Sequence, residues 1–160
     1  MTRMNPMDTE IGGKFAKRFA GVSSLLDRSR LPREVQELVK IRASQINGCG
    51  FCLDMHTKDA VAAGETPVRL ALVAAWRETT VYTDAERAAL ALTEEATRLA
   101  DSTGLSDDTW AHARKHFDDE QLAALVCLVG LINAANRMNV IVGMPGGSYE
   151  AGMFADFVEQ

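Results

Sequence analysis

Residues 46–56 of this chain read Ile-Asn-Gly-Cys-Gly-Phe-Cys-Leu-Asp-Met-His. The Asn-Gly dipeptide predicts the end of one helix and a turn, and a new helix is expected to begin at about Cys49. Cys49, Cys52 and His56 then fall on one face of that helix. Both cysteines lie in its first turn, where free backbone N–H groups and the helix dipole stabilise a thiolate. His56 follows Cys52 by one turn, within reach for proton transfer, directly or through a water.

Outward from this pattern, helical signals dominate and strand signals are poor. Prolines, capping residues and glycines divide the chain into seven expected helices, and we predict an all-α fold with the Cys-x-x-Cys at the start of the third helix. The expected helices cover about 12–28, 32–46, 49–63, 67–78 and 84–100, a sixth that is capped by Ser106, and 119–142. Pro32 suits the first position of its helix. Thr83 and Glu86 form a predicted capping box.

The size and composition of the chain fit one folded domain. It has 160 residues and 17.4 kDa, with 47% hydrophobic and 24% charged residues. These values exclude a disordered chain and are enough for a core without disulfide staples. We expect a single domain over 1–160, with residues 1–11 flexible. The tail 148–160 is expected to form a short helix or an arm that contacts a partner subunit.

Charge and hydropathy exclude several classes of partner. The net charge of −5 leaves no general basic surface for nucleic acid. The most apolar run, 123–132, has the length of a core helix, shorter than the roughly 18 apolar residues of a membrane span. The first residues lack the apolar segment of a secretory signal. We therefore expect a cytoplasmic protein that binds neither membrane nor nucleic acid.

Three interpretations of the Cys-x-x-Cys remain open at this point. In the first, Cys49 and Cys52 cycle through a disulfide and His56 helps to form the thiolate. In the second, Cys49, Cys52 and His56 bind a metal, although the sequence offers no obvious fourth ligand. In the third, all three are buried structural residues. A Cys-x-x-Cys in an intracellular protein favours the redox interpretation.

Other polar residues give weaker signals. His112 and His116 are spaced as an i, i+4 pair, but the helix around them is polar, so we expect a solvated face. Cys127 stands in the apolar segment 125–129 and is expected to be an inert buried thiol. Residues 133–137 (Asn-Ala-Ala-Asn-Arg) place polar groups late in an apolar helix. We interpret them as a buried hydrogen-bond network or a subunit contact rather than as part of the site.

Helical periodicity makes a clear prediction about the exposure of Glu37. Val35, Leu38 and Val39 belong to the main apolar stripe of their helix, and Glu37 lies on the opposite side. Periodicity alone therefore predicts a solvated glutamate. Ile41, one turn on, shows that this side is not purely polar and that a second buried face is possible.

Residues 32–64 as a whole resemble the alkylhydroperoxidase D (AhpD)-like family of the carboxymuconolactone decarboxylase superfamily. The family pattern is a Glu, eleven residues, Cys-x-x-Cys, three residues and a His, and it is matched here by Glu37, Cys49, Cys52 and His56. Weaker likeness extends to Trp76, the segment 83–90 and residues 136–137. The resemblance implies an all-α homo-oligomer, often a trimer or hexamer. It also implies thiol-dependent reduction of hydroperoxides, with no cofactor and no metal.

The resemblance also implies a role for each site residue. Cys52 would attack the peroxide, Cys49 would resolve the product, and Glu37 with His56 would relay protons. An external dithiol or thiol protein would restore the pair. Phe51 replaces a histidine of the characterised peroxidase, which implies a different local proton network. Decarboxylase members lack the thiol pair, which disfavours that reaction here. The alternatives are a disulfide reductase or redox sensor with little peroxidase turnover, and a non-enzymatic metal-binding or assembly protein.

Overall fold

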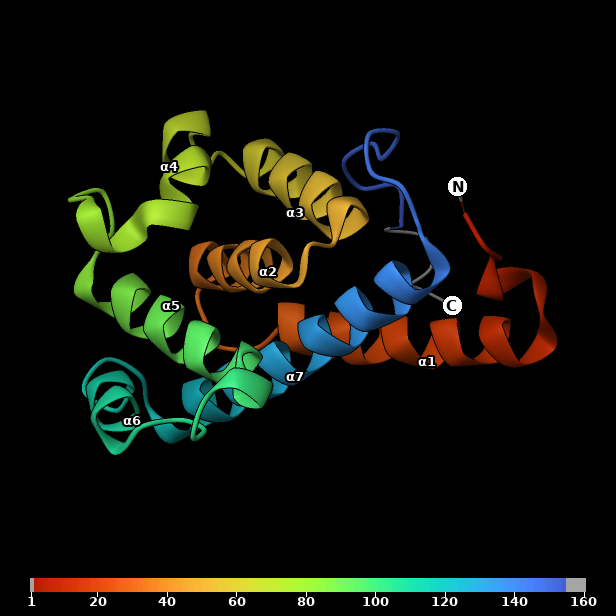
Figure 1. The fold of residues 1–160 in the computed structure, drawn as a ribbon. Coiled ribbons are helices and arrows are strands. Elements are labelled where there is room, and N and C mark those ends of the chain that lie inside the picture. Colours follow the sequence, from red (N-terminus) through yellow and green to blue (C-terminus); the bar gives the residue numbers. More distant parts are fainter. Residues whose placement is uncertain (1, 155–160) are drawn as a thin grey trace.

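The computed structural model describes residues 2–154, and every regular element within them is helical (Figure 1). The all-α prediction is confirmed, as is the position of the Cys-x-x-Cys at the start of the third helix. The α-helices are α1 (Glu10–Asp27), α2 (Arg33–Asn47), α3 (Gly50–Ala62), α4 (Pro67–Leu72), α5 (Asp84–Thr97), α6 (Asp107–Ala113) and α7 (Asp119–Val142). The 3-10 helices are η1 (Pro6–Asp8), η2 (Val73–Glu78) and η3 (Leu99–Asp101).

Most helix starts lie where the capping residues predicted them. Thr83 and Glu86 form the expected capping box at α5, and the hydroxyl of Ser106 accepts the N–H of Thr109 at α6. Asp118 caps α7 in a second capping box. Pro32 is the N-cap of α2 rather than its first residue, so the prediction was wrong by one position.

The predicted single helix over 67–78 was wrong. The α-helix ends at Leu72 and continues as η2, with Ala75 outside helical dihedrals at φ −118° and ψ 28°. In a 3-10 helix, side chains at i and i+3 lie on one face, so Val73 and Trp76 are buried together. Trp76 also donates its indole N–H to Oε1 of Glu94 over 3.0 Å.

The middle of the fold is α2, which packs against α3, α5 and α7 (Figure 1). Val35 and Val39 of α2 join one apolar cluster with α5 and α7, whereas Leu38 and Ile41 join a second cluster with α3 and η2. A helix that is covered on two sides must also bury polar positions of its sequence. This is why Glu37, which periodicity assigned to solvent, lies inside.

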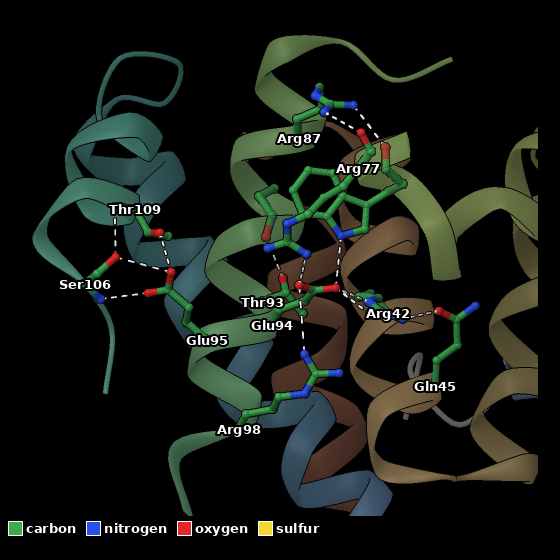
Figure 2. A network of polar contacts seen from close by, with 12 residues as sticks. Arg42, Gln45, Arg77, Arg87, Thr93, Glu94, Glu95, Arg98, Ser106 and Thr109 are labelled. Atoms are coloured by element: carbon green, nitrogen blue, oxygen red, sulfur yellow. Dashed lines mark hydrogen bonds and ion pairs between the residues drawn. The ribbon is translucent and has the colours of Figure 1, made fainter. Parts of the chain in front are cut away.

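A buried carboxylate ties α2, η2 and α5 together, and Figure 2 shows this network. Glu94 of α5 is 4% exposed and is contacted by Arg42, Arg77 and the indole of Trp76. The Nε of Arg42 lies 2.7 Å from Oε1 of Glu94. Burial raises the pKa of Glu94, but the bonds from Arg77, Trp76 and Arg42 outweigh it and lower that pKa. The carboxylate therefore stays charged and joins three elements.

The long helix α7 is more apolar and more exposed than the sequence suggested. By length and composition it could cross a membrane, with a mean hydropathy of 1.7 over its most apolar 18 residues, of which 33% are buried in the fold. It passes on mean hydropathy, whereas the expectation rested on unbroken apolar runs, which polar residues interrupt in this helix. Cys127 is exposed on this helix, so the prediction of a buried thiol was wrong. Val126 and, nearer the end of the helix, Ile141 are also exposed.

The N-terminal segment is bonded to the end of α7, and the residues after α7 lie against α3. Arg3 donates its backbone N–H to the carbonyl of Val142 over 2.7 Å, so part of the segment expected to be flexible is bonded to the fold. Residues 143–154, here called the C-terminal strap, fold back over α3 of the same chain. Asp54 of α3 accepts the backbone N–H groups of Gly147 (2.6 Å) and Tyr149 (3.0 Å). Of the tail expected in a subunit contact, residues 155–160 lie outside the described residues.

Candidate redox site

The turn between α2 and α3 places both cysteines. Gly48 adopts a left-handed conformation, φ 67° and ψ 30°, which is why glycine suits this position. Cys49 is the N-cap of α3, and its sulfur accepts the backbone N–H of Cys52 at 3.3 Å. The two cysteines are joined in a disulfide. The sulfur of the first residue therefore takes the place that a Ser or Asp oxygen takes at other helix starts.

His56, one turn after Cys52 on α3, lies next to Glu37 of α2. The Nδ1 atom of His56 is 3.4 Å from Oε2 of Glu37, an ion-pair distance too long for a strong hydrogen bond. That buried oxygen has no hydrogen-bond partner among residues 2–154. Lys40 donates to the second oxygen, Oε1, at 3.1 Å. All three side chains are buried, with residue exposures of 9% or less.

Electrostatics keep Glu37 charged. Burial raises its pKa, but the contacts of the carboxylate with His56 and Lys40 outweigh burial and hold the pKa at about 2. For Lys40, burial lowers the pKa, but the neighbouring carboxylates of Glu37 and Asp27 raise it and prevail. The pKa of Lys40 therefore lies above its ordinary value. The charged Glu37 thus faces Nδ1 of His56 across 3.4 Å, which favours a proton on Nδ1 and leaves Nε2 as the nitrogen that can exchange a proton.

Amide side chains fix the α2–α3 turn against α7. Asn47, two residues before Cys49, donates to Oδ1 of Asn133 (3.0 Å) and of Asn136 (2.9 Å). Asn136, with no exposed surface, donates to Oγ of Ser44 over 2.9 Å. The buried hydrogen-bond network expected from residues 133–137 is confirmed.

Sequence reasoning missed two residues of the site. Lys40 lies one turn after Glu37 on α2, and the i, i+3 spacing of opposite charges was the available signal. Asn139 of α7 donates its amide N–H to Sγ of Cys52 at 3.3 Å. The signal for Asn139 was the repeat of Asn at 133, 136 and 139 on an otherwise apolar helix.

The sulfur atoms are enclosed, but the carboxylate of Glu37 borders an open pocket. Cys49 is 1% exposed and Cys52 has no exposed surface. The strap lies over the first turn of α3, where Gly146 approaches the carbonyl of Gly50 and the ring of Phe154 lies tilted against that of Phe51, with centroids 6.4 Å apart. On the other side, Glu37 helps to line a pocket of about 290 Å3 between α2, α3 and α4.

The residues of a metal site are not brought together. No group of three or more His, Cys, Asp and Glu side chains among residues 2–154 is placed to hold a metal ion. His112 and His116 stack edge to face, with ring centroids 5.2 Å apart, and His116 is exposed, as expected of a solvated face.

Comparison with known proteins identifies the family of this chain. Residues 13–95 match the carboxymuconolactone decarboxylase family. The uncharacterised protein YdfG of Bacillus subtilis is 40% identical over 134 residues, which cover 84% of this chain and 90% of YdfG. The uncharacterised protein YnjA of Escherichia coli is 31% identical over 75% of this chain and 66% of its own length.

Solved structures share the fold. A crystal structure from Agrobacterium tumefaciens, of a protein of unknown function named as a candidate antioxidant defence protein AhpD, has a TM-score of 0.85 at 32% identity and covers 93% of this chain and 100% of its own. A debrominase crystallised with 2,3,4-tribromopyrrole has a TM-score of 0.77 at 17% identity, covering 85% of this chain and 72% of its own, a likeness of fold alone. By sequence match, identity and fold together, this chain belongs to the carboxymuconolactone decarboxylase family and is one of its AhpD-like members.

Proposed function

We propose that the protein is a thiol-dependent peroxidase that reduces hydroperoxides through the Cys49–Cys52 pair. The observation that carries the proposal is the disulfide at the start of α3 beside His56, whose Nδ1 faces the charged Glu37. A dithiol needs a nearby base to supply its thiolate at neutral pH, since a free cysteine is only a few per cent ionised there. The start of α3 stabilises a thiolate, and His56 provides the base.

The proposed cycle has three steps. The Cys52 thiolate attacks the outer oxygen of the hydroperoxide, the O–O bond breaks, and the alcohol leaves with a proton from His56. Cys52 is now a sulfenic acid. The thiol of Cys49 condenses with it, forming the disulfide and releasing water. An external dithiol then reduces the pair by thiol–disulfide exchange and becomes a disulfide itself.

Glu37 acts on His56 and not on the peroxide in this scheme. With its pKa at about 2, the carboxylate does not take up a proton at neutral pH. It orients the imidazole and stabilises its charged form after the ring accepts the thiol proton. A reducing compartment such as the cytosol would supply the dithiol. We also propose a homo-oligomer, because α7 leaves apolar side chains exposed.

The Agrobacterium relative, a candidate antioxidant protein, supports peroxide as the oxidant. The alternative of a disulfide reductase or redox sensor uses the same pair and differs only in the oxidant. A metal-binding role through Cys49, Cys52 and His56 is not favoured, because no group of three or more His, Cys, Asp and Glu side chains among the described residues is placed to hold a metal ion.

Thiol counting tests the proposal. The reduced Cys127→Ser variant, which removes the exposed thiol, is mixed with one equivalent of a hydroperoxide or of a small disulfide. Rapid loss of both remaining thiols with peroxide supports the peroxidase. Rapid loss with the disulfide alone, and slow reaction with peroxide, would assign the reductase activity instead.

A further inference from the structure

The two sulfur atoms of the redox pair have different hydrogen-bond donors. Sγ of Cys49 accepts the backbone N–H of Cys52, which belongs to the same helix, at 3.3 Å. Sγ of Cys52 accepts the side-chain N–H of Asn139, which comes from α7, at 3.3 Å. No other side chain of residues 2–154 has a hydrogen bond to the Cys52 sulfur.

By itself, the α3 helix would favour Cys49 rather than Cys52 as the nucleophile. Its N-cap position is where free N–H groups and the helix dipole stabilise negative charge best, and Cys49 holds that position. Cys52 is three residues further along, and its own N–H is already bonded to Cys49. A donor from outside α3 is needed to favour charge on Cys52. Hydrogen bonds to an ionised acceptor are about twice as strong as those between neutral groups.

Hydrogen bonds before and after Asn139 along α7 hold this part of the helix in place. Its carbonyl accepts the N–H of Met144 over 2.9 Å where Gly143 ends α7 in a left-handed conformation. One turn before it, Asn136 is fixed by Asn47 and Ser44. The amide of Asn139 therefore reaches Cys52 from a helix that is bonded to the α2–α3 turn, and it needs little reorganisation to meet a thiolate.

The titratable groups near the pair leave this role unfilled. On α3 they are Cys49, His56 and Asp54, of which Asp54 is paired with Lys58, and on α2 they are Glu37 and Lys40, which contact His56 or each other. The guanidinium of Arg137 on α7 bonds to Asn133 instead. His56 can remove a proton, but none of these contacts distinguishes the two sulfurs by charge.

We propose that Asn139 is a catalytic residue that selects Cys52, rather than Cys49, as the thiolate of the redox pair. The amide donates to the sulfur on which the negative charge resides before attack. This inference rests on the proposed thiol chemistry and adds to it the element that sets the order of the two cysteines.

Single-cysteine proteins test the selection without peroxide. The pKa of Cys52 is measured in a Cys49→Ser/Cys127→Ser background, and the pKa of Cys49 in a Cys52→Ser/Cys127→Ser background, both from the ultraviolet absorbance of the thiolate against pH. Asn139→Leu, which keeps the shape and removes the donor, should raise the pKa of Cys52 by about one unit, a tenfold loss of thiolate near neutral pH. The pKa of Cys49 should stay unchanged.

Asn139→Asp separates hydrogen bonding from packing. It is nearly isosteric but places a negative charge beside the sulfur, so it should raise the pKa of Cys52 more than Asn139→Leu does. Equal shifts at both cysteines, or none at Cys52 in folded variants, would overturn the inference. The outcome is independent of turnover: a selective shift in a protein that peroxide does not oxidise would refute the peroxidase and leave the selection by Asn139 standing.

Discussion

Lys40 places its ammonium 3.1 Å from Oε1 of Glu37, on the side of the carboxylate opposite to His56. The acid that orients the histidine is therefore itself held by a buried cation, and Lys40 bonds to Asp27 at 2.9 Å as well. Each carboxylate oxygen has a cationic or potentially cationic neighbour. The arrangement ionises a group that burial alone would neutralise.

The depressed pKa of Glu37 gives a prediction about acid stability. Above its ordinary value of 4.5 the carboxylate is charged in both folded and unfolded chains, and its contribution is complete. Between about 4.5 and about 2 only the unfolded chain binds the proton, so stability falls as the pH falls. Urea unfolding from pH 2 to 6 should show a shallower pH slope in Glu37→Gln. Glu34→Gln, an exposed position on α2, is the control and should keep the wild-type slope.

Glu37 and His56 should act as one unit in peroxide reduction. We expect Glu37→Gln and His56→Gln each to slow oxidation of Cys52 by about 10- to 10⁴-fold, the usual range for losing a general base. The double variant should be little slower than the worse single variant. Stopped-flow rates against pH check this, with Glu34→Gln again as the control. Wild-type rates in a correctly folded Glu37→Gln would remove Glu37 from the mechanism.

The two cysteines should respond differently to substitution. Cys52→Ser should form no sulfenic acid, because the attacking sulfur is gone. Cys49→Ser should still react with peroxide and accumulate sulfenic acid or higher oxides, because no thiol resolves the product. Labelling with a sulfenic-acid probe in a Cys127→Ser background measures both. Labelling of Cys52→Ser alone would exchange the two roles.

Glu94 should matter for stability and not for the chemistry. Glu94→Gln leaves Arg42 and Arg77 without their shared counter-charge, and we expect it to lower the free energy of unfolding by about 3 kcal/mol, at the lower end for breaking a buried ion pair because Gln keeps one acceptor. Glu10→Gln, which breaks an exposed pair with Lys14, should have little effect. Denaturant titrations compare the two. A small change in Glu94→Gln would mean that solvent compensates the network of Figure 2.

The outer face of α7 should form a subunit contact. Val126 is 49% and Ile141 67% exposed, and Cys127 and Gly130 lie between them on the exposed side. The wild-type chain should sediment well above 17.4 kDa, and Val126→Asp should reduce its mass in solution. Val68→Asp, at an exposed apolar position on α4, should not. A monomer at micromolar concentrations in the wild type would contradict the expectation.

Local patterns predicted much of this fold, and the misses share a physical origin. Caps such as Thr83, Ser106 and Asp118 act within a few residues, so sequence spacing finds them. The burial of Glu37 and Lys40 depends on whether a second layer of helices covers α2. The periodicity of a single helix does not show this. The family resemblance identified Glu37, but nothing local could.

Asn139 and Cys127 show the same limit on α7. Whether a position of this apolar helix meets Cys52 or solvent is set by how α7 crosses α2 and α3, a property of tertiary packing. The break at Ala75 similarly follows from the burial of Trp76 against α5 rather than from helix propensity, since the segment 71–75 is rich in Ala and Leu.

The strap sets a limit on which sequences this site can tolerate. At position 146 a Cβ would collide with the carbonyl of Gly50, the first residue of α3, although the backbone there has no left-handed dihedral that would itself demand glycine. The constraint is purely one of space between two backbones. Any side chain at position 146 would force the strap or the start of α3 to shift, so the seat of the strap beside the redox pair depends on the continued absence of a single methyl group.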